Sequence, residues 1–276
     1  MKKMTRKLAL LLVMALLIST CLFTLSACDD DDDDDGDEIE IVDTLNGKTP
    51  LEIYREAETK LESASNAEMS GVADISVKIS GDGISVNQSM DMTMLSQING
   101  ETMYTKITQE SSGVAGSNMI QESWLVGGMF YERIEDEEEN YKVKTPMTYD
   151  EYIEADGDDS EYFIDITSGL LDNAKFKKDG NNYYLDLKLT GEQIQQYAGD
   201  LVSSFGNGMA FDTLNYRMCF DQNGDLKGFN ISFGGSATEE GMTMEMEMTM
   251  RVDVKYGTVG TITAPADAGS YELETY

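Results

Sequence analysis

The sequence contains no histidine among its 276 residues. Histidine is the commonest metal ligand and general base, and its side chain titrates near neutral pH. Its absence excludes much of ordinary enzyme chemistry and the usual pH switch. We therefore expect a protein that is not an enzyme and that holds no cofactor and no metal.

Basic residues are also scarce, because 20 Lys and Arg stand against 52 Asp and Glu, which gives a formal net charge of −32. Nucleic acids and anionic membrane surfaces repel such a chain. We expect no nucleic-acid partner. The sequence contains no pattern that identifies a protein partner.

The first 28 residues form the strongest pattern in the chain. A basic segment at residues 2–7 precedes an apolar run from Leu8 to Leu25, and Leu25-Ser26-Ala27-Cys28 then resembles the lipobox of bacterial lipoproteins. The alternative is a single transmembrane helix, since the apolar run could almost span a bilayer. The acidic run after Cys28 is a poor cytoplasmic flank and favours the lipobox.

The lipobox predicts that residues 1–27 are a signal peptide and that Cys28 carries the lipid anchor. The mature protein would then lie on the outer face of the cell membrane. Cys21 would be lost with the signal peptide, which leaves Cys219 without an intramolecular partner. An inert thiol in a strand is the favoured interpretation of Cys219, with a reactive thiol as the alternative.

Residues 28–48 are predicted to be an acidic, disordered tether. Seven consecutive Asp residues, 29–35, repel one another and extend the chain. Calcium binding by this run is the alternative, but nothing in the sequence would fix the oxygens in a cage. A solvated spacer is favoured, followed by a folded domain from Thr49 to Tyr276.

The rest of the chain is organised around Met242 to Tyr256, where every even residue is apolar and most odd residues are charged or Thr. This period of two predicts a long strand with one apolar and one polar face. A shorter run with the same pattern, Met90 to Met94, lies upstream. The sequence therefore predicts a sheet with a methionine-lined face.

The remaining patterns predict the order helix, about six strands, a helical insert, two strands, a helix and three strands. Thr49-Pro50-Leu51-Glu52 is a capping box that opens the first helix. Asn99-Gly100, Gly127-Gly128 and Asn223-Gly224 stand between alternating runs, as hairpin turns do. Asp221, Asn223 and Asp225 also begin like a calcium loop, but the hairpin is favoured because Leu226 replaces the required Gly.

A long meander follows the lipobox, the acidic tether and the opening helix. In that helix, Tyr54-Arg55-Glu56-Ala57 leads into Leu61-Glu62-Ser63-Ala64. Together they resemble Gram-positive lipoproteins related to the LolA/LppX lipoprotein-carrier superfamily. The resemblance covers Thr49 to Tyr276 and rests on element order more than on any motif. It implies an α+β fold with a single curved antiparallel sheet, a half-open barrel, and helices across its concave face.

Relatives of that kind carry lipids or the acyl chains of lipoproteins, and one branch serves as a stress-sensing regulator. Thioethers are flexible and polarisable, so a methionine-lined surface suits irregular apolar ligands. The alternatives for the methionines are ordinary core packing and copper(I) binding. The residues predicted to line an apolar cavity are Met90, Met92, Met94, Met242, Met244, Met246, Met248 and Met250.

Three hypotheses of function follow. The leading one is a lipid-anchored, non-catalytic binding protein that holds a lipid or acyl chain in an apolar cavity. The second is an envelope sensor or protein-interaction module without a lipid ligand. The third, a carboxylate-dependent hydrolase, stays open because the chain has 52 acids, although no catalytic pair can be singled out.

Overall fold

The computed structural model describes residues 39–81, 84–112, 118–136, 140–156, 168–171, 173–197, 210–239 and 242–274. The predicted signal peptide, Cys28 and the Asp run lie outside the described residues. So do residues 157–167, in the region of the predicted helical insert, and residues 198–209, in the region of the last predicted helix.

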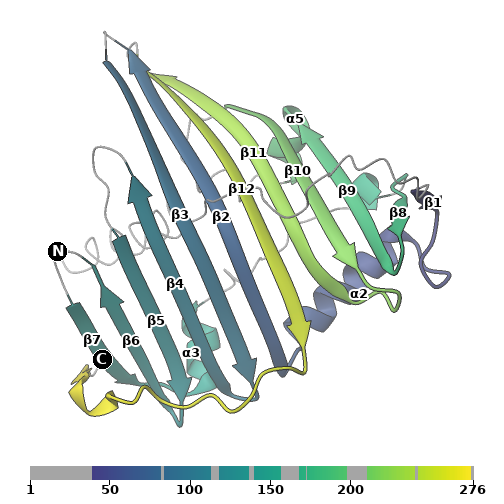
Figure 1. Cartoon of the computed structure of the whole chain (residues 1–276). Coiled ribbons are helices and arrows are strands. Elements are labelled where there is room, and N and C mark those ends of the chain that lie inside the picture. The colour runs from purple at the N-terminus through teal and green to yellow at the C-terminus, as the bar shows by residue number, and fades with distance from the viewer. Residues whose placement is uncertain are drawn as a thin grey trace.

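The described residues form one curved, unclosed sheet of thirteen strands (Figure 1). The strand order across the sheet is β1-β8-β9-β10-β11-β12-β2-β3-β4-β5-β6-β7-β13. This is the half-open α+β architecture predicted from the sequence. The strands are β1 (Glu40–Val42), β2 (Asn66–Gly81), β3 (Ile84–Asn99), β4 (Thr102–Ser112), β5 (Asn118–Val126), β6 (Met129–Glu135), β7 (Asn140–Pro146), β8 (Phe176–Asp179), β9 (Asn182–Thr190), β10 (Ala210–Phe220), β11 (Leu226–Glu239), β12 (Met242–Tyr256) and β13 (Glu272–Leu273).

Two meanders meet in the middle of the sheet. Strands β2 to β7 follow one another, as do β8 to β12, and the last long strand, β12, pairs with the first, β2. Met248 lies opposite Ile75 in that pair, and fourteen residue pairs keep one register. The methionine-rich strand is therefore central in the sheet, where both of its edges are hydrogen-bonded.

The sheet is not wholly antiparallel, which corrects the sequence prediction. Strand β13 pairs with β7 in parallel, with Glu272 opposite Val143. The physical reason is the path of the chain after Tyr256, which runs along the ends of the strands from β12 back to the far edge (Figure 1). A chain that arrives at the edge after such a crossing can add a short parallel strand.

Short helices connect the strands, and the capping box predicted at Thr49 is present. Thr49 accepts a hydrogen bond from the backbone N–H of Glu52, whose carboxylate accepts from the backbone of Thr49, which completes the capping box. Thr148 and Glu151 make the same exchange. The helices are α2 (Pro50–Glu62), α3 (Tyr149–Asp156), α4 (Ser168–Leu171), α5 (Glu192–Tyr197) and the 3₁₀ turn η2 (Ala268–Ser270).

The end of the predicted tether is folded, which corrects the boundary at Thr49. Glu40–Val42 forms edge strand β1, in which Val42 pairs with Phe176 of β8. Leu45 is 2% exposed and belongs to the hydrophobic core. Strand β1 has only three residues, too few for a sequence pattern to predict it. Its pairing with the distant strand β8 defines it.

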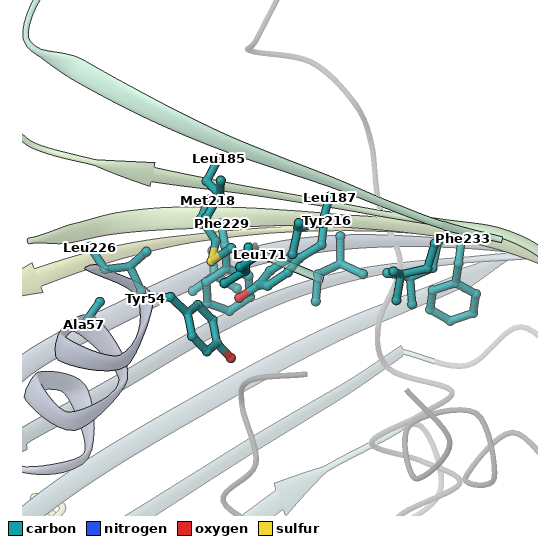
Figure 2. Packing of buried hydrophobic residues seen from close by; sticks show 14 of the residues in the cluster. Tyr54, Ala57, Leu171, Leu185, Leu187, Tyr216, Met218, Leu226, Phe229 and Phe233 are labelled. Carbon is teal, nitrogen blue, oxygen red and sulfur yellow. The ribbon is translucent and has the colours of Figure 1, made fainter. Parts of the chain in front are cut away.

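The hydrophobic core lies between α2, α4 and α5 and the strands from β8 to β12. Figure 2 shows Tyr54 and Ala57 of α2 beside core residues of these strands. Tyr216 and Phe229 pack edge to face at 5.8 Å between ring centroids, and Phe176 packs likewise on Phe220 at 6.1 Å. The helices therefore cover one half of the apolar face. Strands β3 to β7 extend that face beyond the helix-covered core.

Candidate functional site

All eight methionines of the candidate site lie on one face of the sheet, which is called here the methionine face. Met248 and Met250 of β12 lie opposite Ile75 and Ala73 of β2. In the β2–β3 hairpin, Asn66 lies opposite Asn99 and Gly81 lies opposite Ile84. This register places odd residues of β2 opposite even residues of β3. A Cβ on Gly71 would meet the terminal methyl group of Met94 at 3.5 Å, which confirms that alignment.

The methionine face is divided between core and surface. Met246 and Met248 are 8% and 5% exposed and belong to the core cluster, and Met92 is 5% exposed. Met246 and Met248 are therefore ordinary core residues, which was the alternative to a ligand-binding role. The other five are half-buried: Met90, Met94, Met242, Met244 and Met250.

The same face continues across β4 to β7 with further apolar side chains. Ile98 of β3 lies opposite Met103, which lies opposite Leu125 and then Phe130. Helix α3 packs on the end of this row, since the rings of Phe130 and Tyr152 are 5.7 Å apart. The apolar surface therefore spans the sheet from β8 to β6.

The opposite, convex face is polar. Lys78 of β2 pairs with Glu245 of β12 at 2.6 Å, and Lys255 pairs with Glu68 at 2.9 Å. Six Ser, Thr, Asn and Gly residues of β11 lie opposite the odd residues of β12 on this face. The alternation that predicted one apolar and one polar side is thus present in β12 and its neighbours β2 and β11.

Acidic side chains of the convex face repel one another across the strands. Asp91 lies opposite Glu110, and Asp74 lies beside Asp91 on the next strand. Burial and the neighbouring Asp91 raise the pKa of Asp74 to about 6, against a hydrogen bond from Thr249 that lowers it. Burial, with Glu110, likewise raises the pKa of Asp91.

A second cluster of the convex face was not foreseen from the sequence. Glu122 is 6% exposed, and its carboxylate accepts hydrogen bonds from Arg133 and from the hydroxyl of Tyr104 at 2.7 Å. The C-terminal segment covers the neighbouring surface, where Tyr271 packs edge to face on Tyr131 at 5.5 Å. The carboxylate of Glu122 therefore links strands β4, β5 and β6 beneath the C-terminal segment. Its charge is already paired within the protein, so it needs no ligand.

A carboxylate on the concave face, that of Glu132, also escaped sequence reasoning. Glu132 of β6 accepts a hydrogen bond of 3.0 Å from the side-chain amide of Gln121 on β5. Burial raises the pKa of Glu132, Gln121 lowers it, and the charge of Glu274 raises it further. A carboxylate with a raised pKa on an apolar surface is a candidate for ligand recognition.

A pocket of about 330 Å³ lies elsewhere, at the ends of β4 to β7. None of the eight methionines lines this pocket, so the methionine face and the pocket are separate features. The residues around it are Thr108, Gln109, Glu110, Asn118, Met119, Ile120, Glu135, Asp136 and Asn140.

The other motifs of the sequence have structural roles in the described part of the chain. Asp221 to Asp225 form the β10–β11 turn, in which Asp221 accepts from the backbone N–H groups of Asn223 and Asp225. Within the described ranges, no group of three Asp, Glu or Cys side chains could hold a metal ion. The described helices are also too short or too polar to cross a membrane.

The fold is thus an α+β half-barrel whose sheet has one apolar and one polar face. The chain belongs to the DUF6612 family, a family of unknown function, which it matches over residues 49–270. No curated protein matches the sequence.

Two solved structures align with most of the chain. A DUF1329 family protein from Desulfovibrio piger aligns over 76% of this chain and 92% of its own, at 10% identity and a TM-score of 0.22. Rv2717c from M. tuberculosis aligns over 69% of this chain and 94% of its own, at 6% identity and a TM-score of 0.18. At these scores neither likeness bears on function.

Proposed function

We propose that this protein is a lipid-anchored, non-catalytic binding protein that holds a lipid or an acyl chain against the methionine face. Cys28 supplies the anchor, and the domain lies on the outer face of the cell membrane. A carrier of the LolA/LppX type is the finer form of this proposal.

The observation that carries the proposal is the extent of the apolar surface. Helices α2, α4 and α5 pack over β8 to β12, and half-buried Met90 and Met94 pack against the edge of that core and keep part of their surface accessible. Ile134 and Met103 continue the surface on strands farther along the sheet. Flexible thioethers can pack against an acyl chain of any shape, which is what a lipid carrier requires.

The proposal is tested by native mass spectrometry of the full-length lipoprotein purified from its own host, with organic extraction of the same sample. A stoichiometric co-purifying lipid is expected, and its mass names the ligand class. A protein that emerges without lipid would contradict the proposal. Capture of a protein partner by that empty protein would favour the sensor or interaction module instead.

A further inference from the structure

Four polar residues lie directly opposite one another on four successive strands of the concave face. Ser96 of β3 pairs with Thr105 of β4, Thr105 with Ser123 of β5, and Ser123 with Glu132 of β6. This set is called here the polar rung. Because neighbouring strands are about 4.8 Å apart, the polar rung offers a hydrogen-bonding group at each such interval.

Apolar residues flank the polar rung along the strands. Ile98, Met103, Leu125 and Phe130 form the row on the side of α3, and Leu125 there is 2% exposed. On the other side lie Met94, Ile107 and Ile134, with Gln121 between the last two. Hydroxyls in such a position are not needed for folding, since apolar side chains would bury more surface.

The polar rung is half-buried and within reach of a ligand. All four of its residues keep part of their surface accessible. Gln121 donates to one carboxylate oxygen of Glu132, which orients the carboxylate on the concave face.

Resting on the proposed function, we propose that the polar rung binds the head group of a neutral amphiphile that carries several hydroxyl groups, while its acyl chain lies on the methionine face. Ser and Thr hydroxyls both donate and accept, as the hydroxyls of a glycerol or sugar do. Glu132 accepts from one ligand hydroxyl. The chemistry is shared by an acylglycerol and by a glycolipid.

The charge of the site selects against other head groups. An anionic phosphate would face Glu132 and a chain with a net charge of −32. An ammonium group is best held by several carboxylates or an aromatic cage, and the polar rung has one carboxylate and no aromatic side chain. A neutral polyol fits the three hydroxyls and the single acceptor.

The test uses the full mature chain with Cys28→Ala, which removes the proposed anchor and keeps every described residue. The protein is incubated with vesicles that each contain one probe, monooleoylglycerol, diglucosyl-dioleoylglycerol, phosphatidylglycerol or phosphatidylethanolamine. It is then re-isolated, and native mass spectrometry counts the bound probe. We expect at least tenfold more of a hydroxylated neutral probe than of either phospholipid, and the two neutral probes distinguish glycerol from sugar.

The variant Thr105→Val with Glu132→Gln is expected to lose that preference at least tenfold and to keep its total lipid binding. Thr108→Val with Glu245→Gln is the matched control, because both residues face the convex side. Thermal unfolding of each variant verifies the fold, and Ser123→Ala replaces the double variant if that one does not fold.

The outcomes separate the two proposals. Retention of no probe by the parent protein would contradict the proposed function itself. Retention without the neutral preference, or a preference that survives in Thr105→Val with Glu132→Gln and in Ser123→Ala, would overturn the polar rung and leave the proposed function standing.

Discussion

The side-chain amide of Gln121 donates a hydrogen bond of 3.0 Å to the carboxylate of Glu132, across strands β5 and β6. The bond places both side chains on the concave face, the same face as the methionines. A charged group there must either keep its hydration or shift its pKa. Burial raises the pKa of Glu132, which gives this relationship a measurable consequence.

Glu132 is predicted to make folding less favourable as the pH rises. A carboxyl group whose pKa is raised by folding contributes stability that is complete below its ordinary pKa and is lost as the pH passes the raised value. Glu132→Gln should therefore flatten the decline in unfolding free energy between pH 4.5 and pH 7. Urea denaturation at several pH values measures it, and identical slopes would contradict the prediction.

Asp74, on the convex face, is predicted to show a pH dependence of the same direction, because burial and a neighbouring carboxylate also raise its pKa. Its pKa of about 6 reflects burial and the neighbouring Asp91. Asp74→Asn should stabilise the protein at pH 7 by about 1 kcal/mol, a figure discounted for solvent screening, and have little effect at pH 4. Thermal melts at the two pH values provide the readout, with Glu245→Gln on the same face as control.

Gly228 is predicted to tolerate no side chain. A Cβ there would lie 2.3 Å from the backbone oxygen of Val252, whereas one on Gly234 of the same strand would lie 3.6 Å from that of Met246. Backbone atoms of a central strand pair cannot move aside without breaking the ladder. Gly228→Ala should cost about 2 kcal/mol or more in urea denaturation, and Gly234→Ala much less. Equal costs would show that β11 and β12 are less tightly paired.

The methionines are predicted to differ in their contribution to stability. Met248 is 5% exposed within the core cluster, whereas Met90 is half-buried. Met248→Ala should lower the unfolding free energy by about 3 kcal/mol and Met90→Ala by about 1 kcal/mol. Equal losses would mean that the methionine face is packed uniformly, as a core is, and would weaken the case for a ligand surface.

The succession of elements was predictable from the sequence because each signal is local. Turn glycines show this: Gly100, Gly127 and Gly128 have φ of +62°, +63° and +74°, which a primed hairpin turn requires. The capping boxes at Thr49 and Thr148 are equally local. Alternation then assigned the faces of β12 and β3, and the eight methionines share one face of the sheet. That they line a cavity stays a prediction.

What could not be predicted depends on contacts between distant parts of the chain. The β12–β2 pairing joins Tyr256 to Ala67, and edge strands β1 and β13 contain three and two residues. The polar rung is invisible for the same reason. Ser96 and Thr105 each look like ordinary interruptions of an alternating strand, and only the register across four strands brings them into line.

The most direct test of the central claim places a photo-crosslinking residue, p-benzoylphenylalanine, at Met94 and, separately, at Thr93. The two positions are adjacent in β3 and face opposite sides of the sheet, Met94 toward the concave side and Thr93 toward solvent. After irradiation in the native host, a lipid-binding concave face predicts a lipid adduct at Met94 and none at Thr93. Adducts of equal yield at both positions, or none at Met94, would contradict it.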